Sequence, residues 1–381
     1  MSGAELDAHV VVRRRDFRLH AHLHVAAGEV VALMGPSGAG KSTLLTAVAG
    51  LTRLSGGHVR IGDHEVAAVA SRTHLRPALR GAVLLGQNAR LFPHLNARAN
   101  VAFGLRARGV PRKLAVAEAD DWLWRVGLAG SGDHMTAELS GGQQQRIAVA
   151  RALATAPRVL LLDEPLTALD PETAADVRAM LHEQLSATKV TALVVTHDAV
   201  DAAALASRLI VVETGAITQE GAVAEVLAAP ATSFAATVAG RNRVLGVAAG
   251  GAWSMVDSER DAHPPVVIVA SDRASRAAAA QDGVDLSAVF RPGAVHLEAA
   301  PDPSWTGALR LVAESTPEPG SWLARVVRIE RTPGGARVHT MTPAVAVDVA
   351  ADDVAALGLA PGHAVRLRVA PDDVRLLRVT R

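Results

Sequence analysis

The sequence predicts an α/β domain built on a largely parallel sheet, followed by a smaller β-rich domain. Three short runs are apolar on both faces, as expected for strands that helices cover on each side of a parallel sheet. The first run leads through a glycine-rich turn into a helical pattern. After about residue 229, helical periodicity gives way to alternating runs, which are typical of half-buried strands. The apolar runs are 29–34, 159–162 and 191–195, and the alternating ones include 365–370 and 374–379.

Helix signals follow these strands. A helical pattern at 42–49 follows the glycine-rich turn, and another at 142–155 follows a Ser/Gly segment. A third helix is predicted over 171–185, because Asp170 and Pro171 form a typical helix N-terminus. We therefore expect an α/β domain over residues 1–230, a hinge over 231–245 and a β-rich, barrel-like domain over 246–381.

Composition narrows the functional classes. A length of 381 residues suits two domains. The 39 Lys and Arg residues nearly balance the 38 Asp and Glu residues, so net charge indicates neither nucleic acid nor an anionic membrane surface as partner. The absence of cysteine excludes disulfides and thiolate metal sites. With no signal peptide and no run of about 18 apolar residues, we expect a cytosolic chain whose membrane role would need another subunit.

A phosphate-binding loop is predicted between the first strand and its helix. The run GPSGAGKS at 35–42 has the spacing of glycine, four residues, glycine, lysine and serine that such loops require. Glycines let the backbone amides surround a phosphate chain, and the helix N-terminus adds its positive dipole end. Lys41 supplies a cation for the β- and γ-phosphates, and the Ser42 hydroxyl is a magnesium ligand. The predicted nucleotide-binding residues are Gly35, Pro36, Ser37, Gly38, Ala39, Gly40, Lys41, Ser42 and Thr43.

Two acidic residues end the second apolar run. Asp163 is placed to hold magnesium directly or through water. Glu164 is expected to face the terminal phosphate and to orient or deprotonate the attacking water. A solvated acid at a strand end is the alternative for Glu164. The phosphate loop alone leaves kinases, GTPases, helicases and transport ATPases open, and the acidic strand narrows this range.

A second serine–glycine motif begins the 142–155 helix. The run LSGGQ at 139–143, followed by QQRIAVARAL, closely resembles the signature motif of ATP-binding-cassette (ABC) proteins. In that family this segment closes over the ATP held by a partner subunit. The resemblance therefore implies a head-to-tail homodimer with two ATP molecules at its interface, which fits a chain with two anion-binding helix starts. The implied contacts to the partner's ATP are Ser140, Gly141, Gly142 and Gln143.

Three further residues match family motifs in the family's order. Gln87 resembles the Q-loop glutamine, which implies contact with the magnesium ion and the attacking water. Asp170 resembles the D-loop aspartate that crosses the dimer interface, and it is also placed to cap the following helix. His197 resembles the switch histidine that contacts the γ-phosphate and positions the catalytic water.

Two features lie upstream of the phosphate loop. The family stacks adenine on an aromatic residue, often tyrosine, and this chain has no tyrosine. Phe17 is the nearest candidate, although it lies closer to Gly35 than the usual residue does. A guanidinium plane from residues 13–15 is the alternative. The histidines that alternate nearby are expected to be exposed polar positions without a role, namely His20, His22 and His24.

The second domain resembles the small-molecule-binding (TOBE-like, OB-type) β domains of bacterial importers. The matching runs are FRPG at 290–293 and IERTPGG at 329–335, although turn-flanked strands of any β barrel could look alike. A coiled-coil repair protein is disfavoured by the absence of a long heptad insertion, and tandem translation factors by the single cassette. The whole chain is most similar to the ATPases of molybdate importers. The resemblance implies an ATP hydrolase that energises oxyanion import at the cytoplasmic face of a bacterial membrane.

The same resemblance implies partners. These are transmembrane permease subunits and, indirectly, an extracytoplasmic substrate-binding protein, whereas no nucleic acid is expected. The alternatives are a sulfate, ferric-iron, polyamine or sugar importer and, more distantly, a switch in repair or translation. A groove for a permease helix, or else buried packing, is predicted for Leu91, Phe92, Pro93 and Leu95. Candidate oxyanion ligands, or else solvated surface arginines, are Arg291 and Arg331.

Overall fold

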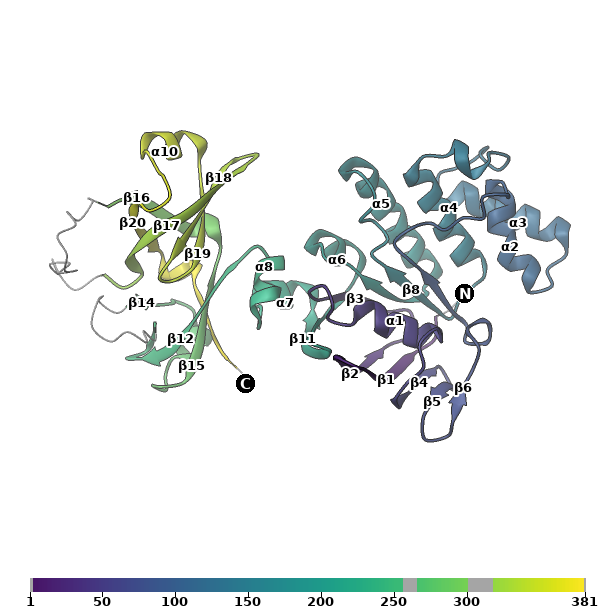
Figure 1. Ribbon diagram of the computed structural model, residues 1–381, viewed down its shortest axis with the longest axis horizontal. Coiled ribbons are helices and arrows are strands. Elements are labelled where there is room, and N and C mark those ends of the chain that lie inside the picture. Colours follow the sequence, from purple (N-terminus) through teal and green to yellow (C-terminus); the bar gives the residue numbers. More distant parts are fainter. Residues whose placement is uncertain (1–2, 256–265, 301–317, 380–381) are drawn as a thin grey trace. The chain divides into compact units, whose positions relative to one another are not determined.

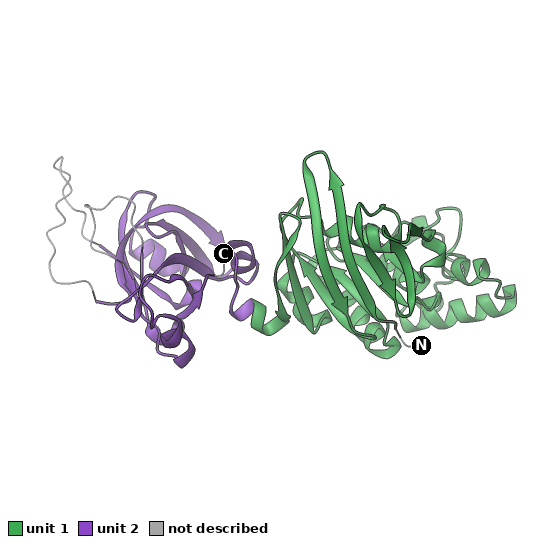
Figure 2. Ribbon diagram, turned by 90° about the horizontal axis from the view of Figure 1, so that it is seen from below, with its two compact units in different colours: residues 1–226 green, residues 227–381 purple. Residues whose placement is uncertain are grey.

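The computed structural model describes residues 3–255, 266–300 and 318–379. The chain divides into two compact units, Met1–Val226 and Leu227–Arg381 (Figure 2). The segment 231–245 contains a short helix, α8 (Ser233–Val238), and the start of a strand, β12 (Asn242–Ala249). Among the described residues, no helix is both long and apolar enough to cross a membrane.

Unit 1 is an α/β unit with one sheet, as the sequence predicts (Figure 1). Over the described residues the sheet has 11 strands in the order β6-β5-β4-β1-β2-β11-β10-β3-β9-β8-β7. The strands are β1 (Leu6–Arg14), β2 (Phe17–Val25), β3 (Val30–Met34), β4 (Gly56–Ile61), β5 (His64–Ala68), β6 (Thr73–His74), β7 (Ala82–Leu85), β8 (Val159–Asp163), β9 (Thr191–Val195), β10 (Arg208–Glu213) and β11 (Ala216–Ala222). The helices are α1 (Lys41–Ala49), α2 (Ala97–Ala107), α3 (Arg112–Arg125), α4 (Gly141–Ala154), α5 (Pro171–Thr188), α6 (Ala199–Leu205) and α7 (Val223–Ala228).

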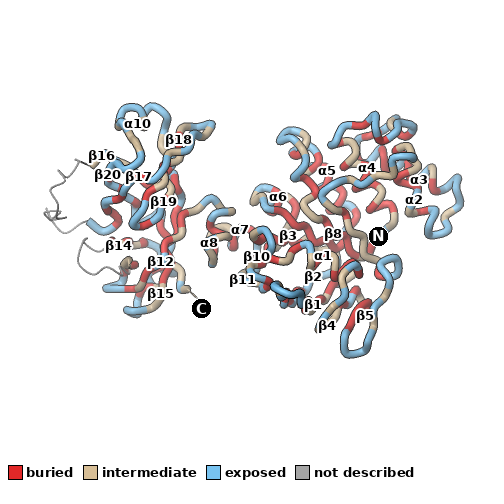
Figure 3. Tube along the Cα trace, in the orientation of Figure 1, coloured by how far each residue is buried: buried red, intermediate tan, exposed pale blue. Residues whose placement is uncertain are grey.

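Five neighbouring strands, β10-β3-β9-β8-β7, pair in parallel and contain the three apolar runs predicted as buried strands. Their side chains alternate between two apolar clusters. Leu161 and Leu193 pack with α1, whereas Leu160 and Val194 pack on the opposite face with α2 to α5. All four are fully buried, in line with the red interior of the unit (Figure 3). Burial of each such side chain contributes roughly 1.5–3 kcal/mol, which explains the apolar character of both faces.

The rest of the sheet differs from the largely parallel arrangement that the sequence predicts. Strands β6, β5, β4, β1 and β2 pair antiparallel with one another in that order, as do β10 and β11, whereas β2 and β11 pair in parallel. Burial alternates along β2, so one face packs on the core and the other faces water. Such half-solvated strands have polar residues at every second position, and for this reason they lack the continuous apolar run that marks the parallel strands.

Helices α2, α3 and α4 pack together into a helical subdomain, and α4 begins at the Ser/Gly segment of the signature motif. Trp122 of α3 is buried there, and Asn96 caps α2 by accepting a hydrogen bond from the Ala99 amide (2.8 Å). Two short 3₁₀ helices complete the unit, at Pro77–Leu79 and Thr136–Glu138.

Unit 2 is β-rich, as predicted, and its described residues form two five-stranded antiparallel sheets. Both sheets contribute to one apolar cluster, in which Phe290 and Trp322 pack edge to face with ring centroids 6.4 Å apart. One sheet comprises β12, β13 (Ala252–Ser254), β14 (Val267–Ile268), β15 (Asp285–Phe290) and β21 (Arg375–Arg378). The other comprises β16 (Val295–Ala299), β17 (Ser321–Thr332), β18 (Gly335–Met341), β19 (Val345–Val349) and β20 (Ala364–Val369). The remaining elements are α9 (Arg273–Ala278), α10 (Ala351–Ala356) and the 3₁₀ turns Pro292–Ala294 and Pro371–Asp373.

Candidate nucleotide site

The candidate site lies at the carboxyl ends of the parallel strands. The phosphate loop follows β3, the two acids end β8, His197 follows β9, and Gln87 follows β7. Because these strands are parallel neighbours, their carboxyl ends share one edge of the sheet. Backbone hydrogen bonds connect these ends, from the Glu164 amide to the Val195 carbonyl (3.0 Å) and from the Thr196 amide to the Leu33 carbonyl (3.2 Å).

The phosphate loop is a compact turn that positions Lys41 at the start of α1. The Lys41 ammonium donates to the carbonyls of Gly35 (2.6 Å) and Pro36 (3.0 Å). Burial lowers the pKa of Lys41, against the opposing charges of Glu164 and Asp163. Gly35 must be glycine, because a Cβ there would lie 2.0 Å from the Val212 carbonyl oxygen.

Asp163 is a partly buried acid beside the phosphate loop. Burial raises the pKa of its carboxyl above the usual value and outweighs the hydrogen bond from Ser42. Its Oδ1 is buried and has no hydrogen-bond partner among the described residues. A buried carboxylate oxygen without a donor suits a cation, so Asp163 and the Ser42 hydroxyl form a donor set that fits a magnesium ion.

Glu164 and His197 face one another across the ends of β8 and β9. His197 Nδ1 lies 3.7 Å from Glu164 Oε2, and the Thr167 hydroxyl donates to the same oxygen (3.4 Å). Glu164 has a φ of 50°, in the left-handed region that a non-glycine residue seldom adopts. Such backbone strain costs about 1–3 kcal/mol and is concentrated at functional sites. At this turn the Glu164 carboxylate faces His197.

Gln87 is exposed at the end of β7, where the chain leaves the sheet for α2. The sequence analysis missed the two residues that shape this connection. Asn100 is fully buried in α2, where it accepts from the Phe92 amide (2.8 Å) and donates to the Leu95 carbonyl (3.1 Å). Arg151 of α4 donates to the Ala89 carbonyl (3.0 Å). A polar residue in the buried phase of a helix was the available signal for Asn100.

The signature segment is joined to the D-loop. Ser140 caps α4 by accepting from the Gln143 amide (3.3 Å), and Gln143 in turn accepts from the Ser140 amide (3.0 Å). Asp170 caps α5, as predicted, with its carboxylate accepting from the Thr173 amide (3.0 Å). A Cβ on Gly142 would lie 2.2 Å from Thr173 Cγ2, so the two helix starts touch. In the part of the chain that the structure describes, no hydrogen bond or ion pair links Ser140–Gln143 to the phosphate loop.

Phe17, the first residue of β2, lies against the phosphate loop. A Cβ on Gly40 would lie 2.7 Å from Phe17 Cζ, so only glycine fits at that position, where φ is 104°. The structure therefore brings the candidate adenine-stacking ring beside the loop.

The candidate oxyanion ligands of the second unit, Arg291 and Arg331, are both exposed.

Arg80 is a buried support of α1 that the sequence analysis also missed. It is 1% exposed and donates to the carbonyls of Ala47 (2.9 Å) and Val48 (3.0 Å) in the last turn of the helix. It also donates to the Leu75 carbonyl (2.9 Å). A cation at a helix C-terminus satisfies carbonyls that lack an intrahelical partner. Arg80 thus anchors the end of the helix that begins at the phosphate loop.

Comparison with known proteins decides the family. The ABC transporter family matches residues 19–167. Over 384 aligned residues the chain is 37% identical to the molybdenum import ATP-binding protein ModC of Mycobacterium tuberculosis, covering 99% of this chain and 97% of the relative. The chain belongs to the ABC transporter family. The sequence-based prediction of an ATP-hydrolysing ABC subunit of the importer type is confirmed.

Other ABC relatives align over shorter stretches. The putative 2-aminoethylphosphonate import ATP-binding protein PhnT of Salmonella typhimurium is 43% identical over 226 residues, covering 58% of this chain and 59% of the relative. The Fe(3+) ions import ATP-binding protein FbpC of Agrobacterium fabrum is 44% identical over 223 residues, covering 58% of this chain and 62% of the relative. A solved dimeric ATP-binding cassette, MJ0796 with ADP and phosphate, is 28% identical at a TM-score of 0.48, covering 57% of this chain and 98% of that one.

Proposed function

We propose that this chain hydrolyses ATP to power molybdate import through a membrane permease. The observation that carries the proposal is the length of the match to the molybdenum import protein, which includes the second unit, whereas the phosphonate and iron relatives align over only 58% of the chain. Whole-chain similarity is the stronger argument, because the cassette itself need not contact the transported ion.

The site residues have defined roles in this proposal. The amides of residues 35–43 and the Lys41 ammonium bind the β- and γ-phosphates. Phe17 stacks on adenine. Glu164 accepts a proton from water as its oxygen attacks the γ-phosphorus, and the bond to the ADP oxygen breaks, so ADP and phosphate are released. His197 orients this water because it lies 3.7 Å from the Glu164 carboxylate.

Asp163 and Ser42 would hold magnesium, with Gln87 contributing from the end of β7. The unpartnered Oδ1 of Asp163 supports this assignment. When bound, magnesium neutralises the charge of the phosphates. The hydrogen bond from Ser42 holds the Asp163 carboxylate in place.

We propose that the working form is a homodimer. Ser140–Gln143 and Asp170 form one group at touching helix starts, apart from the phosphate-loop contacts of the same chain. In a head-to-tail dimer, the signature segment would bind the ATP held by the partner, and each chain would supply half of both sites.

A permease-facing surface is proposed beside Gln87. Phe92 and Phe103 stack with ring centroids 4.4 Å apart, and Phe103 is 49% exposed. Leu91 is partly buried against the apolar cluster of the helical subdomain, whereas Pro93 is exposed. The exposed Phe103 ring, packed against the partly buried Phe92, suits a short apolar helix of the permease at the cytoplasmic face of the membrane. Motion produced by hydrolysis at Glu164 would be transmitted through this contact.

Two experiments test the proposal. Deletion of the gene should abolish molybdate uptake, measured as cellular molybdenum, and complementation should restore it. Unchanged molybdenum with lost uptake of sulfate, phosphonate or iron would refute the substrate. Glu164→Gln should bind ATP, stabilise the dimer in light scattering and slow hydrolysis at least about 100-fold, the contribution expected of a general base. Glu183→Gln, an exposed acid on α5, is the matched control. Steady hydrolysis by Glu164→Gln would contradict its assignment.

A further inference from the structure

A row of imidazoles crosses three antiparallel strands of unit 1. His9 on β1 pairs with His22 on β2 and with His58 on β4. Directly opposed residues of antiparallel strands share a face, with Cβ atoms about 5 Å apart. The ring centroids accordingly lie 5.5 Å (His9–His22), 6.1 Å (His9–His58) and 6.5 Å (His22–His58) apart. We call these three residues the imidazole row.

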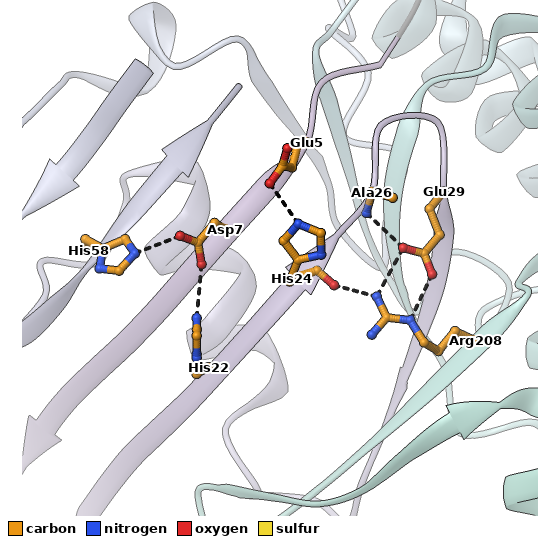
Figure 4. A network of polar contacts seen from close by, with 8 residues as sticks. All are labelled: Glu5, Asp7, His22, His24, Ala26, Glu29, His58 and Arg208. Atoms are coloured by element: carbon orange, nitrogen blue, oxygen red, sulfur yellow. Dashed lines mark hydrogen bonds and ion pairs between the residues drawn. The ribbon is translucent and has the colours of Figure 1, made fainter. Parts of the chain in front are cut away.

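A carboxylate joins the imidazole row. Asp7, two residues before His9, accepts hydrogen bonds from His22 Nε2 and His58 Nε2, each at 3.0 Å (Figure 4). On the other side, His20 Nε2 lies 3.0 Å from His9 Nε2. Ring nitrogens and a carboxylate oxygen are the ligands that zinc and similar metals prefer.

These separations approach those of a zinc site. With bonds of about 2.0–2.1 Å at tetrahedral angles, two ligand atoms lie about 3.3 Å apart, and two imidazole centroids about 5 Å apart. Over the described ranges, no group of three or more His, Cys, Asp or Glu side chains is already arranged to hold a metal ion. Binding therefore requires rotation of side chains, which is accessible because the His22 side chain is 64% exposed.

The surroundings favour a cation. Asp7 also lines a surface hollow of about 650 Å³. Clustered carboxylates raise the local concentration of cations. The hollow is lined by Glu5, Asp7, Arg60, Gly62, Asp63 and Glu65.

We propose that this face of unit 1 binds one divalent first-row transition-metal ion of the zinc class, through His9, His22, His58 and Asp7. The ion fastens β2, β1 and β4 together on their solvent side. Magnesium does not compete, because it prefers oxygen ligands and dehydrates reluctantly. The site is separate from the nucleotide site and does not depend on its assignment.

The test is zinc titration of the full chain, produced without a histidine tag, by calorimetry near neutral pH. One ion per chain should bind and raise the Tm. His9→Ala combined with His22→Ala should weaken binding at least about tenfold, and Co²⁺ should show tetrahedral ligand-field bands that this variant loses. His94→Ala combined with His182→Ala removes two exposed histidines outside the row and should bind zinc as the parent chain does.

Asp7→Asn provides a second variant, because the amide keeps a hydrogen-bonding group at this position while removing the charge. It too should weaken zinc binding without lowering the metal-free Tm substantially. Acidification should release the ion, because protons compete with the metal for the ring nitrogens. Zinc affinity unchanged in His9→Ala/His22→Ala, equal loss in the His94/His182 control, or no binding by the parent chain would each overturn the proposal.

Discussion

Replacement of Arg80 by methionine should loosen α1, the helix that begins at the phosphate loop. Methionine keeps a long, unbranched side chain but removes every donor. The carbonyls of Ala47 and Val48 in the last turn would lose their side-chain partner, as would the Leu75 carbonyl. Arg80 is nearly fully buried, so water cannot simply take its place.

The magnitude follows from these three contacts. A hydrogen bond from a charged donor is worth about 1.5–3 kcal/mol net, and a cation at a helix C-terminus adds about 0.3–2 kcal/mol. Against this, burial lowers the pKa of Arg80, and no carboxylate pairs with it in the described part of the chain, so its desolvation already costs free energy. Removing the buried charge recovers several kcal/mol of desolvation cost, so we expect Arg80→Met to destabilise α1 by roughly 2–4 kcal/mol, less than the sum of the lost contacts.

Native-state amide exchange of peptides covering α1 measures this change directly. A loss of roughly 2–4 kcal/mol corresponds to exchange about 30- to 700-fold faster, since each 1.4 kcal/mol is tenfold. The matched control is Arg76→Met, because Arg76 is exposed in the same connection. Exchange of α1 within about threefold of the parent chain in Arg80→Met would refute the reasoning.

Three further predictions concern the site. Because the pKa of Asp163 is raised in the folded protein, ionisation of its carboxyl lowers the stability as pH rises through that pKa. Asp163→Asn should therefore raise the Tm at neutral pH. It should not do so below the ordinary aspartate pKa of 3.8, where the carboxyl is protonated in both states. Gly40→Ala should weaken ATP binding at least about tenfold, because it adds the Phe17 clash to the φ strain. Gly109→Ala is the matched control, because Gly109 also has a positive φ but no atom within 4 Å of an added Cβ, and it should leave ATP binding unchanged. Gly142→Ala should cost about 1–3 kcal/mol, and Thr173→Ser should recover part of it; strictly additive Tm effects would contradict this contact.

The parts of the candidate nucleotide site could be placed from the sequence because they are short and local. The phosphate loop, the two acids after β8 and the caps Ser140 and Asp170 each lie within a few residues of the strand or helix that positions them. Three of the five parallel strands, β3, β8 and β9, were equally predictable, since burial on both faces demands an unbroken apolar run, whereas β7 and β10 were not predicted. The helix boundaries agree with the predicted ones within a few residues for the same reason.

What remained hidden depends on contacts between distant segments. Arg80 reaches back to Ala47, and Arg151 reaches Ala89, and nothing in a local pattern distinguishes these arginines from the many exposed ones. Asn100 lies on the buried face of α2, a helix that the sequence analysis did not predict, so its polar side chain in an apolar position was not recognised.

By itself, the sequence predicted a nucleoside-triphosphate site at the ends of parallel strands in an α/β domain, and a β-rich second domain, because motif spacing and apolar periodicity are local properties. Only the tertiary structure decided which strand lies beside which. That order places Phe17 on Gly40 and His197 by Glu164, and the antiparallel register aligns His9, His22 and His58 on one face. Strand pairing is set by long-range packing, which no short segment encodes.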